Sequence, residues 1–306
     1  MGAYIVRQLA SKVVVLLGIT IVTFILIDAI PADPARLILG QHASEAAVKA
    51  LRIQLGLNLP LPIRYLRYLG SLLHGNLGYS YVFNMPVTTM ILQRMGASAW
   101  LALGCWIAEI IIGIPLGIFT ARRAHGPLDY FISALALVGI SLPVFWLGLI
   151  LLYWLGYIHQ IFPLGGIGGI RYLVLPALTY GITGAAYYQR LLRSSMLEVM
   201  GLDYVRTARA KGASDNRVVW RHVVRNALIP VMTYAGIDIG YLMTGVVLIE
   251  ATFNWNGLGL MAYTAISNDD VPVIMGTVLL IAVFVVVFTL LVDIVYSILD
   301  PRIRYD

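Results

Sequence analysis

The chain has 306 residues, of which 60% are hydrophobic and only 12% are charged. With a mean hydropathy of +0.85, this composition excludes an ordinary soluble globular protein. The net charge of +6 does not indicate nucleic-acid binding, because the lysines and arginines lie in short segments beside long apolar runs, as the positive-inside rule predicts. The single cysteine, Cys105, excludes an internal disulfide.

Six apolar runs approach the length of about 20 residues that a helix needs to cross a bilayer. They are too long and too uniformly apolar to be strands of a transmembrane barrel. We therefore predict an all-α integral membrane protein with a single transmembrane domain over 1–306 and its core helices within 97–298. The six predicted membrane-spanning helices cover 9–30, 97–121, 129–155, 173–193, 230–252 and 273–298.

The distribution of basic residues predicts the orientation. Fourteen of the 21 lysines and arginines lie at the two termini, at 122–123 and within 190–225. Six of the remaining seven lie within 31–95, a loop too long to weigh much in the positive-inside rule. We therefore expect both termini and the 194–229 loop to be cytoplasmic, facing anionic lipid.

The segment 31–95 is the one sizeable piece predicted outside the membrane, and we expect it to be a small helical extracytoplasmic loop. Helical spacing over 44–57, with Ser44 as N-cap, predicts one helix there. A second helix is predicted within 62–78, where apolar residues recur on one face. The glycine-rich loop at 156–172 is expected to form a compact turn.

The chain has none of the common catalytic or metal-binding motifs. It contains no GxxxxGK[ST] phosphate loop, no HExxH and no CxxC, and its five histidines have no ligand spacing. We therefore expect no catalytic residues, no metal site, and no cofactor in this chain.

A basic segment, DYVRTARAKGASDNRVVWRHVVRNALIP (203–230), separates the fourth and fifth apolar runs. Asp203 is the predicted N-cap of a short helix, and Gly212 its left-handed closing residue. Ser214 would cap a second helix, and Pro230 would mark the transition into the membrane. The charge alone fits contact with anionic lipid, but the helix–glycine–helix pattern also fits docking to a cytoplasmic partner.

The phrases RTARAKG (206–212) and RHVVRNALIP (221–230) resemble the EAA loop of permease subunits in binding-protein-dependent ABC importers. The likeness is to the first permease of the dipeptide, oligopeptide and nickel branch. It extends along nearly the whole chain, through FILIDAIPADPARLI (24–38), SLPVFWLGLILLY (141–153), EATFNWNGLG (250–259) and LLVDIVYSILDPRIR (290–304).

This resemblance implies a multi-pass subunit of a bacterial or archaeal cytoplasmic membrane. Its partners would be a homologous second permease, two cytoplasmic subunits that bind ATP and magnesium, and an extracytoplasmic solute-binding protein. The EAA loop would seat its first helix in an ATPase groove, which implies a coupling role for Asp203, Tyr204, Arg206, Thr207, Ala208, Arg209, Lys211, Gly212 and Ser214. Arg206, Thr207 and Arg225 depart from the general motif, so the contact would lack its glutamate.

Two further sets of residues are candidates for the transport path. Glu109 and Asp238 lie near the middle of predicted membrane helices, where a carboxyl group either lines a pathway for an amine or cation or bonds neighbouring helices. The segment 250–259 is either an interfacial aromatic belt or, as the resemblance implies, an outer gate facing the binding protein. Its residues are Glu250, Phe253, Trp255, Gly257 and Gly259.

The resemblance predicts import of dipeptides or oligopeptides. Relatives of this architecture that carry nickel or metal chelates or glutathione leave those substrates open. A stand-alone secondary transporter that uses Glu109 and Asp238 as ion sites is the alternative of another class. The absence of a visible sequence repeat weighs against it.

Overall fold

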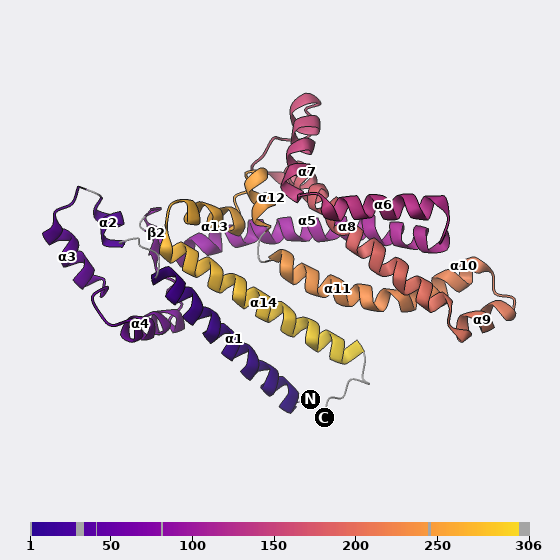
Figure 1. The fold of residues 1–306 in the computed structure, drawn as a ribbon, viewed down its shortest axis with the longest axis horizontal. Coiled ribbons are helices and arrows are strands. Elements are labelled where there is room, and N and C mark those ends of the chain that lie inside the picture. Colours follow the sequence, from indigo (N-terminus) through magenta and orange to yellow (C-terminus); the bar gives the residue numbers. More distant parts are fainter. Residues whose placement is uncertain (1, 29–33, 41, 81, 244–245, 300–306) are drawn as a thin grey trace. The chain divides into compact units, whose positions relative to one another are not determined.

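A computed structural model shows a mostly helical chain with one short β-hairpin (Figure 1). It describes residues 2–28, 34–40, 42–80, 82–243 and 246–299. The chain forms two compact units, the first made of residues 1–96 and 257–287 and the second of residues 97–256 and 288–306.

The long helices agree in position with the predicted apolar runs, and several short helices lie between them. The helices are Gly2–Asp28 (α1), Pro34–Leu39 (α2), Glu45–Gln54 (α3), Leu61–Leu73 (α4), Val87–Arg122 (α5), Pro127–Ser141 (α6), Val144–Leu151 (α7), Gly169–Met200 (α8), Asp203–Ala210 (α9), Asp215–Val218 (α10), Arg225–Met243 (α11), Val247–Thr252 (α12), Leu258–Ser267 (α13) and Val271–Leu299 (α14). Two π-helical segments, Leu152–Ile158 (η1) and Val219–Val224 (η2), continue α7 and α10.

In the first unit, the predicted loop helices are present. The Ser44 hydroxyl accepts a hydrogen bond from the Ala47 N–H at 3.3 Å, which confirms the predicted cap of α3. The second predicted helix ends at Leu73, before an antiparallel pair of strands, Tyr79–Ser80 (β1) and Met85–Pro86 (β2), that the sequence did not indicate. The extracytoplasmic position of this loop stays a prediction.

In the second unit, α5 and α8 pack closely through small residues. A Cβ added to Gly113 would lie 2.5 Å from the Tyr188 Cβ, and one added to Gly181 would lie 2.5 Å from the Ala108 Cβ. Small residues let helix backbones approach closely where lipid provides no hydrophobic drive between helices. These glycines therefore allow α5 and α8 to pack directly against each other.

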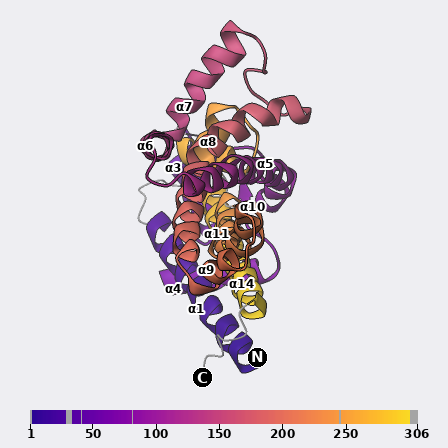
Figure 2. The same ribbon diagram turned by 90° about the vertical axis from the view of Figure 1, so that its right-hand side faces the viewer.

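The third predicted membrane helix, 129–155, is wrong as a single straight helix. It breaks between α6 and α7 with a bend of 101° (Figures 1 and 2). Pro143 disfavours the helical conformation at the residue before it, and Leu142 accordingly has an extended ψ of 132°. The bend directs α7 and η1 away from the line of α6.

The fifth predicted helix, 230–252, is likewise wrong as one continuous helix in the described residues. It consists of α11 and the short α12, and Val246, the N-cap of α12, is not helical (φ −85°, ψ 71°). By length and composition, two described helices are long and apolar enough to cross a membrane, Val87–Arg122 and Val271–Leu291, or three when the bent pair is counted as one. The full count of six stays a prediction.

Candidate functional site

The basic segment forms a tight hairpin, although its first helix begins one residue earlier than predicted. Leu202, not Asp203, occupies the N-cap position of α9, because its backbone is extended (φ −75°, ψ 148°) while Asp203 is already helical. Asp203 instead places its carboxylate in the first turn, where the helix dipole favours an acid.

The turn after α9 has the predicted glycine in its closing position. Gly212 has φ +80°, a left-handed conformation that costs a residue with a Cβ roughly 1 kcal/mol or more. Its N–H donates to the Arg209 carbonyl at 2.9 Å, and the next N–H, of Ala213, donates to the Ala208 carbonyl at 3.3 Å. This paired arrangement is a Schellman motif and defines the end of the helix sharply.

The second half of the hairpin is continuous with the helix that follows it. Ser214 occupies the predicted N-cap position, but its side chain makes no capping hydrogen bond. The chain then runs through α10 and η2 into α11 without an interruption. Pro230 lies inside α11 rather than at its start, so the predicted boundary there is wrong. Instead of a separate second helix, the hairpin ends in one long helix of the second unit.

Packing attaches α9 firmly to this helix. Val205 is fully buried, in an apolar cluster with Val219 and Val223 of η2 and Met196 of α8. No other residue of α9 is buried. Val205, with the half-buried Ala208 beside it, therefore holds the inner face of α9, and the other residues of the helix are exposed.

Hydrogen bonds supplement the packing of α9. The Tyr204 hydroxyl donates to the His222 carbonyl at 3.2 Å and accepts from the Asn226 Nδ2 at 2.8 Å. At the turn, Arg122 at the end of α5 donates to the Asn216 side chain at 2.8 Å. The hairpin is thus attached to α5 and α8 as well as to η2, and Figure 1 shows α9 and α10 at the ends of α8 and α11.

The outer surface of the hairpin is basic and accessible. Arg206 is 73% exposed and lies 3.7 Å from Asp203 on the same helix, while Arg209 lies 3.9 Å from Asp215 across the turn. Thr207 and Lys211 are also exposed. Most of the residues that the resemblance assigns to coupling therefore form a charged outer surface, and Val205 anchors the helix beneath them.

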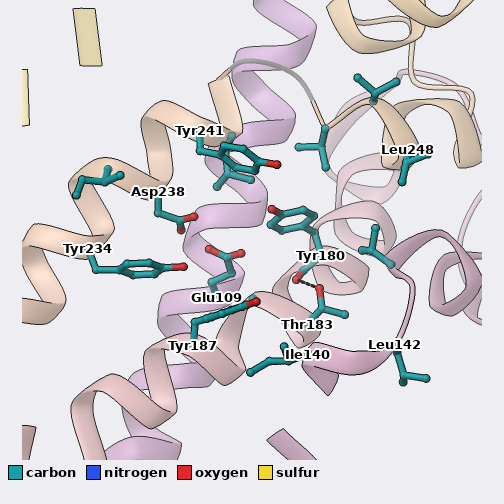
Figure 3. Close-up of a pocket in the computed structure, with 16 residues that line it drawn as sticks. Glu109, Ile140, Leu142, Tyr180, Thr183, Tyr187, Tyr234, Asp238, Tyr241 and Leu248 are labelled. Atoms are coloured by element: carbon teal, nitrogen blue, oxygen red, sulfur yellow. Dashed lines mark hydrogen bonds between the residues drawn. The ribbon is translucent and has the colours of Figure 1, made fainter. Parts of the chain in front are cut away.

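The second candidate site is a cavity of about 730 Å³ lined by residues of α5, α6, α7, α8, α11 and α12 in the second unit. Glu109 of α5 and Asp238 of α11, predicted to line a pathway, both lie at this cavity, and Figure 3 shows their carboxyl groups on the same side of it. Their side chains are 1% and 9% exposed, respectively.

The two carboxyl groups differ in how they are satisfied. The Tyr188 hydroxyl donates to Asp238 Oδ2 at 2.8 Å. Asp238 therefore bonds α11 to α8, which is the second of the two roles expected for a carboxyl group in the middle of a membrane helix. Glu109 Oε2 has no hydrogen-bond partner in the described residues. The Glu109 carboxyl lies against Gly184, where an added Cβ would be 1.8 Å from Oε1. The glycine therefore leaves room for the acid.

Sequence reasoning missed the tyrosines of this cavity. Tyr180 and Tyr187 lie on α8, and Tyr234 and Tyr241 lie on α11 (Figure 3). Each pair is separated by seven residues, a spacing that places both members on one helix face. Asp238 lies between the α11 pair on that same face. This repeated spacing was the available signal.

The third candidate site is the segment that begins at α12. Glu250 is fully buried and accepts a hydrogen bond from the Ser98 hydroxyl at 2.7 Å. The Trp255 Nε1–H donates to the Ala97 carbonyl at 2.9 Å, and Phe253 and Trp255 are each 1% exposed. Because both rings are buried, they do not form an interfacial belt.

The glycine-rich loop packs against this segment, a contact that the sequence did not indicate. The Gly166 N–H donates to the Phe253 carbonyl at 2.9 Å. A Cβ on Gly165 would lie 2.6 Å from the same oxygen, so only glycine fits there. Two other residues proposed for an outer gate, Gly257 and Gly259, belong to the first unit. Gly257 is the N-cap of α13, and Gly259 lies within that helix.

Comparison with protein families gives two adjoining matches. Residues 113–305 match the family described as binding-protein-dependent transport system inner membrane component. Residues 1–102 match the description of the N-terminal part of such a membrane component. Together the two matches include the hairpin, the third candidate site and all of the first unit.

Curated relatives match along the full length. The chain is 39% identical over 316 residues to the oligopeptide transport system permease protein AppB of Bacillus subtilis, with 100% of both chains covered. It is 38% identical over 333 residues to the dipeptide transport system permease protein DppB of Alkalihalophilus pseudofirmus, again with 100% of both covered.

Among solved structures, the fold is similar to that of the MetNI methionine ABC transporter in an inward-facing form. The TM-score is 0.59 at 18% identity, and the match covers 69% of this chain and 96% of that one. Since the helical fold, the family models and the full-length relatives agree, this chain belongs to the family of binding-protein-dependent transport system inner membrane components.

Proposed function

We propose that the chain is a membrane-spanning permease subunit of an ATP-driven importer of di- or oligopeptides. The observation that carries this proposal is the match of the whole chain to permeases named for peptide transport. The hairpin supports it, because a helix that is anchored on its inner face and exposed on its outer face is suited to transmit a partner's motion.

In the proposed assembly, this subunit forms half of the translocation pathway, with six membrane-spanning helices and both termini in the cytoplasm. A homologous second permease forms the other half, two cytoplasmic subunits bind ATP and magnesium, and a solute-binding protein delivers the peptide from outside. Glu109 and Asp238 line the pathway. The segment from Glu250 to Gly259 belongs to the outer gate.

The coupling role rests on residues 203–214. Arg206, Thr207, Arg209 and Lys211 supply the outer surface that enters a groove of the ATPase, and Gly212 closes the helix behind them. Closure of the ATPase pair would then displace a rigid α9, and the helices to which it is attached would move with it between inward-open and outward-open states.

Charge reversal on this surface tests the proposal. In a reconstituted complex, Arg206→Glu with Arg209→Glu should abolish peptide uptake while ATP hydrolysis continues, because the surface charge changes and the anchor beneath it does not. Lys49→Glu, on exposed α3 of the first unit, is the matched control and should leave uptake unchanged. Normal uptake by the doubly reversed complex would refute the coupling role.

The substrate is tested separately. Peptide import has two alternatives. The first is an importer of metal chelates or glutathione with the same architecture, and the second, which is less favoured, is a stand-alone secondary transporter. Mass spectrometry of the ligand carried by the copurifying solute-binding protein should identify peptides. A glutathione or nickel ligand would move the chain to another branch, and transport without any ATPase subunit would overturn the importer assignment.

A further inference from the structure

The cavity between α5, α8 and α11 has two matching walls of tyrosine. Tyr234 and Tyr241 lie on one face of α11 with Asp238 between them, and Tyr180 and Tyr187 lie on one face of α8. In Figure 3 these side chains lie around a common space together with the carboxyl groups of Glu109 and Asp238. Two acids and four aromatic rings therefore surround one volume.

The charge of this volume is of one sign. The described residues that line it include two carboxylic acids and no lysine, arginine or histidine. A charged side chain in the middle of a membrane protein is costly unless it is paired. In the part of the chain that the structure describes, the basic partner that would offset these acids is absent from the cavity wall.

Glu109 indicates that the missing partner is a ligand. An acid whose only task is to bond two helices would have both oxygens satisfied, as buried polar groups generally are. Glu109 is 1% exposed, yet its Oε2 has no hydrogen-bond partner in the described residues. Gly184 makes room for the carboxyl group itself, since an added Cβ would lie 1.8 Å from Oε1. The neighbouring group within hydrogen-bonding reach is the Asp238 carboxyl, and because two carboxylates carry no donor, the pair is one hydrogen-bond donor short.

The arrangement of the rings indicates the chemistry of that donor. Tyr187 and Tyr234 lie nearly parallel, with centroids 6.5 Å apart, and Tyr188 meets Tyr234 edge to face at 5.1 Å. Aromatic faces attract cations, and aromatic cages bind ammonium groups in proteins. A neutral ligand would not offset the charge of the acids.

We propose that this cavity is a subsite for a substrate's ammonium group, which donates to Glu109 and Asp238 while the tyrosines enclose it. The proposal rests on the proposed function, since a peptide in transit presents its N-terminal amine. A volume of about 730 Å³ is in the range that holds a small ligand. The permease then selects for a free amine itself, in addition to whatever its binding protein selects.

The first experiment measures binding without transport. The complete transporter is placed in nanodiscs of neutral phosphatidylcholine, and saturation-transfer NMR compares n-butylammonium with n-butanol. The wild-type complex should bind the cation at least about tenfold more tightly than the alcohol. The isosteric double change Glu109→Gln and Asp238→Asn should remove that difference. Equal binding of both probes, or a preference unchanged in the variant, would overturn the proposal.

Two further variants keep this test decisive. Glu198→Gln makes the same chemical change on the exposed end of α8, away from the cavity, and should bind like the wild type. If the double variant does not assemble, Tyr187 can be replaced, because it is 50% exposed. Tyr187→Phe keeps the ring and should retain binding, whereas Tyr187→Leu should weaken it about threefold. Equal affinities of these two variants would contradict the aromatic contribution.

The second experiment measures import. Alanine peptides of two to five residues, each with a free or an acetylated N-terminus, are offered to the complex with one and the same binding protein. The ratio of free to acetylated peptide imported should fall about tenfold in the acid-to-amide variant, and an unchanged ratio would refute the subsite. Import of no peptide at all would instead refute the proposed function, and the binding experiment would still decide the ammonium subsite.

Discussion

Truncation of Val205 tests whether the hairpin works as a rigid element. Val205 is fully buried beneath α9, so no partner subunit touches it, and Val205→Ala leaves the outer surface of the helix unchanged. Any effect on coupling must therefore come from the attachment of α9 to α8 and η2. Changes on the exposed arginines do not allow this separation.

The size of the effect follows from the burial. Removal of two buried methyl groups costs about 1.6 kcal/mol in transfer free energy, and the cavity left behind raises this to about 2–3 kcal/mol. Because Val205 is the one buried residue of α9, most of this loss should affect local opening of the helix. A loss of about 2 kcal/mol corresponds to roughly 30-fold more frequent opening.

Hydrogen exchange of the α9 amides measures this opening directly. In the complete transporter, exchange should accelerate about 30-fold in Val205→Ala, and more ATP should be hydrolysed per peptide imported. Val287→Ala is the matched control, because that valine is 44% exposed, and it should change neither quantity. Unaltered exchange in Val205→Ala would refute the anchoring role. Faster exchange with normal coupling would refute the need for rigidity.

Three other perturbations follow from the packing. Arg193 donates two 2.7 Å hydrogen bonds to Asp129. Asp129→Asn removes the charge and one of the two acceptor oxygens and should cost about 2–3 kcal/mol, less than a fully buried pair because the Arg193 side chain is 25% exposed; a double-mutant cycle with Arg193→Met measures the coupling. Gly113→Ala should lower thermal stability, since its Cβ would lie 2.5 Å from a side chain of α8, whereas Gly96→Ala, with open space around it, should not. Gly212→Ala should cost about 1 kcal/mol because of its left-handed φ and should raise the ATP used per peptide imported; unchanged coupling would show that the turn tolerates strain.

Local chemistry made much of the hairpin predictable. A glycine after a basic amphipathic helix predicted the left-handed closure at Gly212, and Ser44 predicted a cap, because both depend on a few neighbouring residues. The N-cap of α9 was misplaced by one residue, because side-chain type alone does not tell whether Leu202 or Asp203 is the residue that leaves the helical conformation. Such boundaries depend on tertiary contacts as much as on side-chain type.

The long helices show a different limit. Hydropathy located the apolar runs, but it does not respond to a single proline. The predicted third helix therefore ran through Pro143, whereas a boundary was placed at Pro230. The structure breaks at the first and continues through the second. Upstream of Pro230, the chain is already π-helical in η2, and tightly packed there. Neighbouring helices can satisfy a proline-disrupted backbone, and no local rule predicts where they do.

The polar cavity could not be predicted as a set, because its members come from helices far apart in the sequence. Glu109 and Asp238 stood out singly, since an acid in an apolar run is costly. The tyrosines did not stand out, because an aromatic residue in a membrane helix is ordinary. Their meaning depends on which face of α8 meets which face of α11, and a single sequence does not contain that pairing.

The cavity and the hairpin share the same two helices. α8 is continuous from Tyr180 to Met200 at the base of the hairpin, and the path from α10 through η2 to Asp238 is likewise uninterrupted. From Tyr187 to Met200, a helical rise of about 1.5 Å per residue gives a lever of about 20 Å. We therefore expect ATP to change n-butylammonium binding in the wild-type complex. In Val205→Ala, resting affinity should persist while the ATP effect shrinks, because the altered side chain lies at the far end of that lever. An ATP effect of normal size in the variant would mean that motion reaches the cavity by a route other than α9.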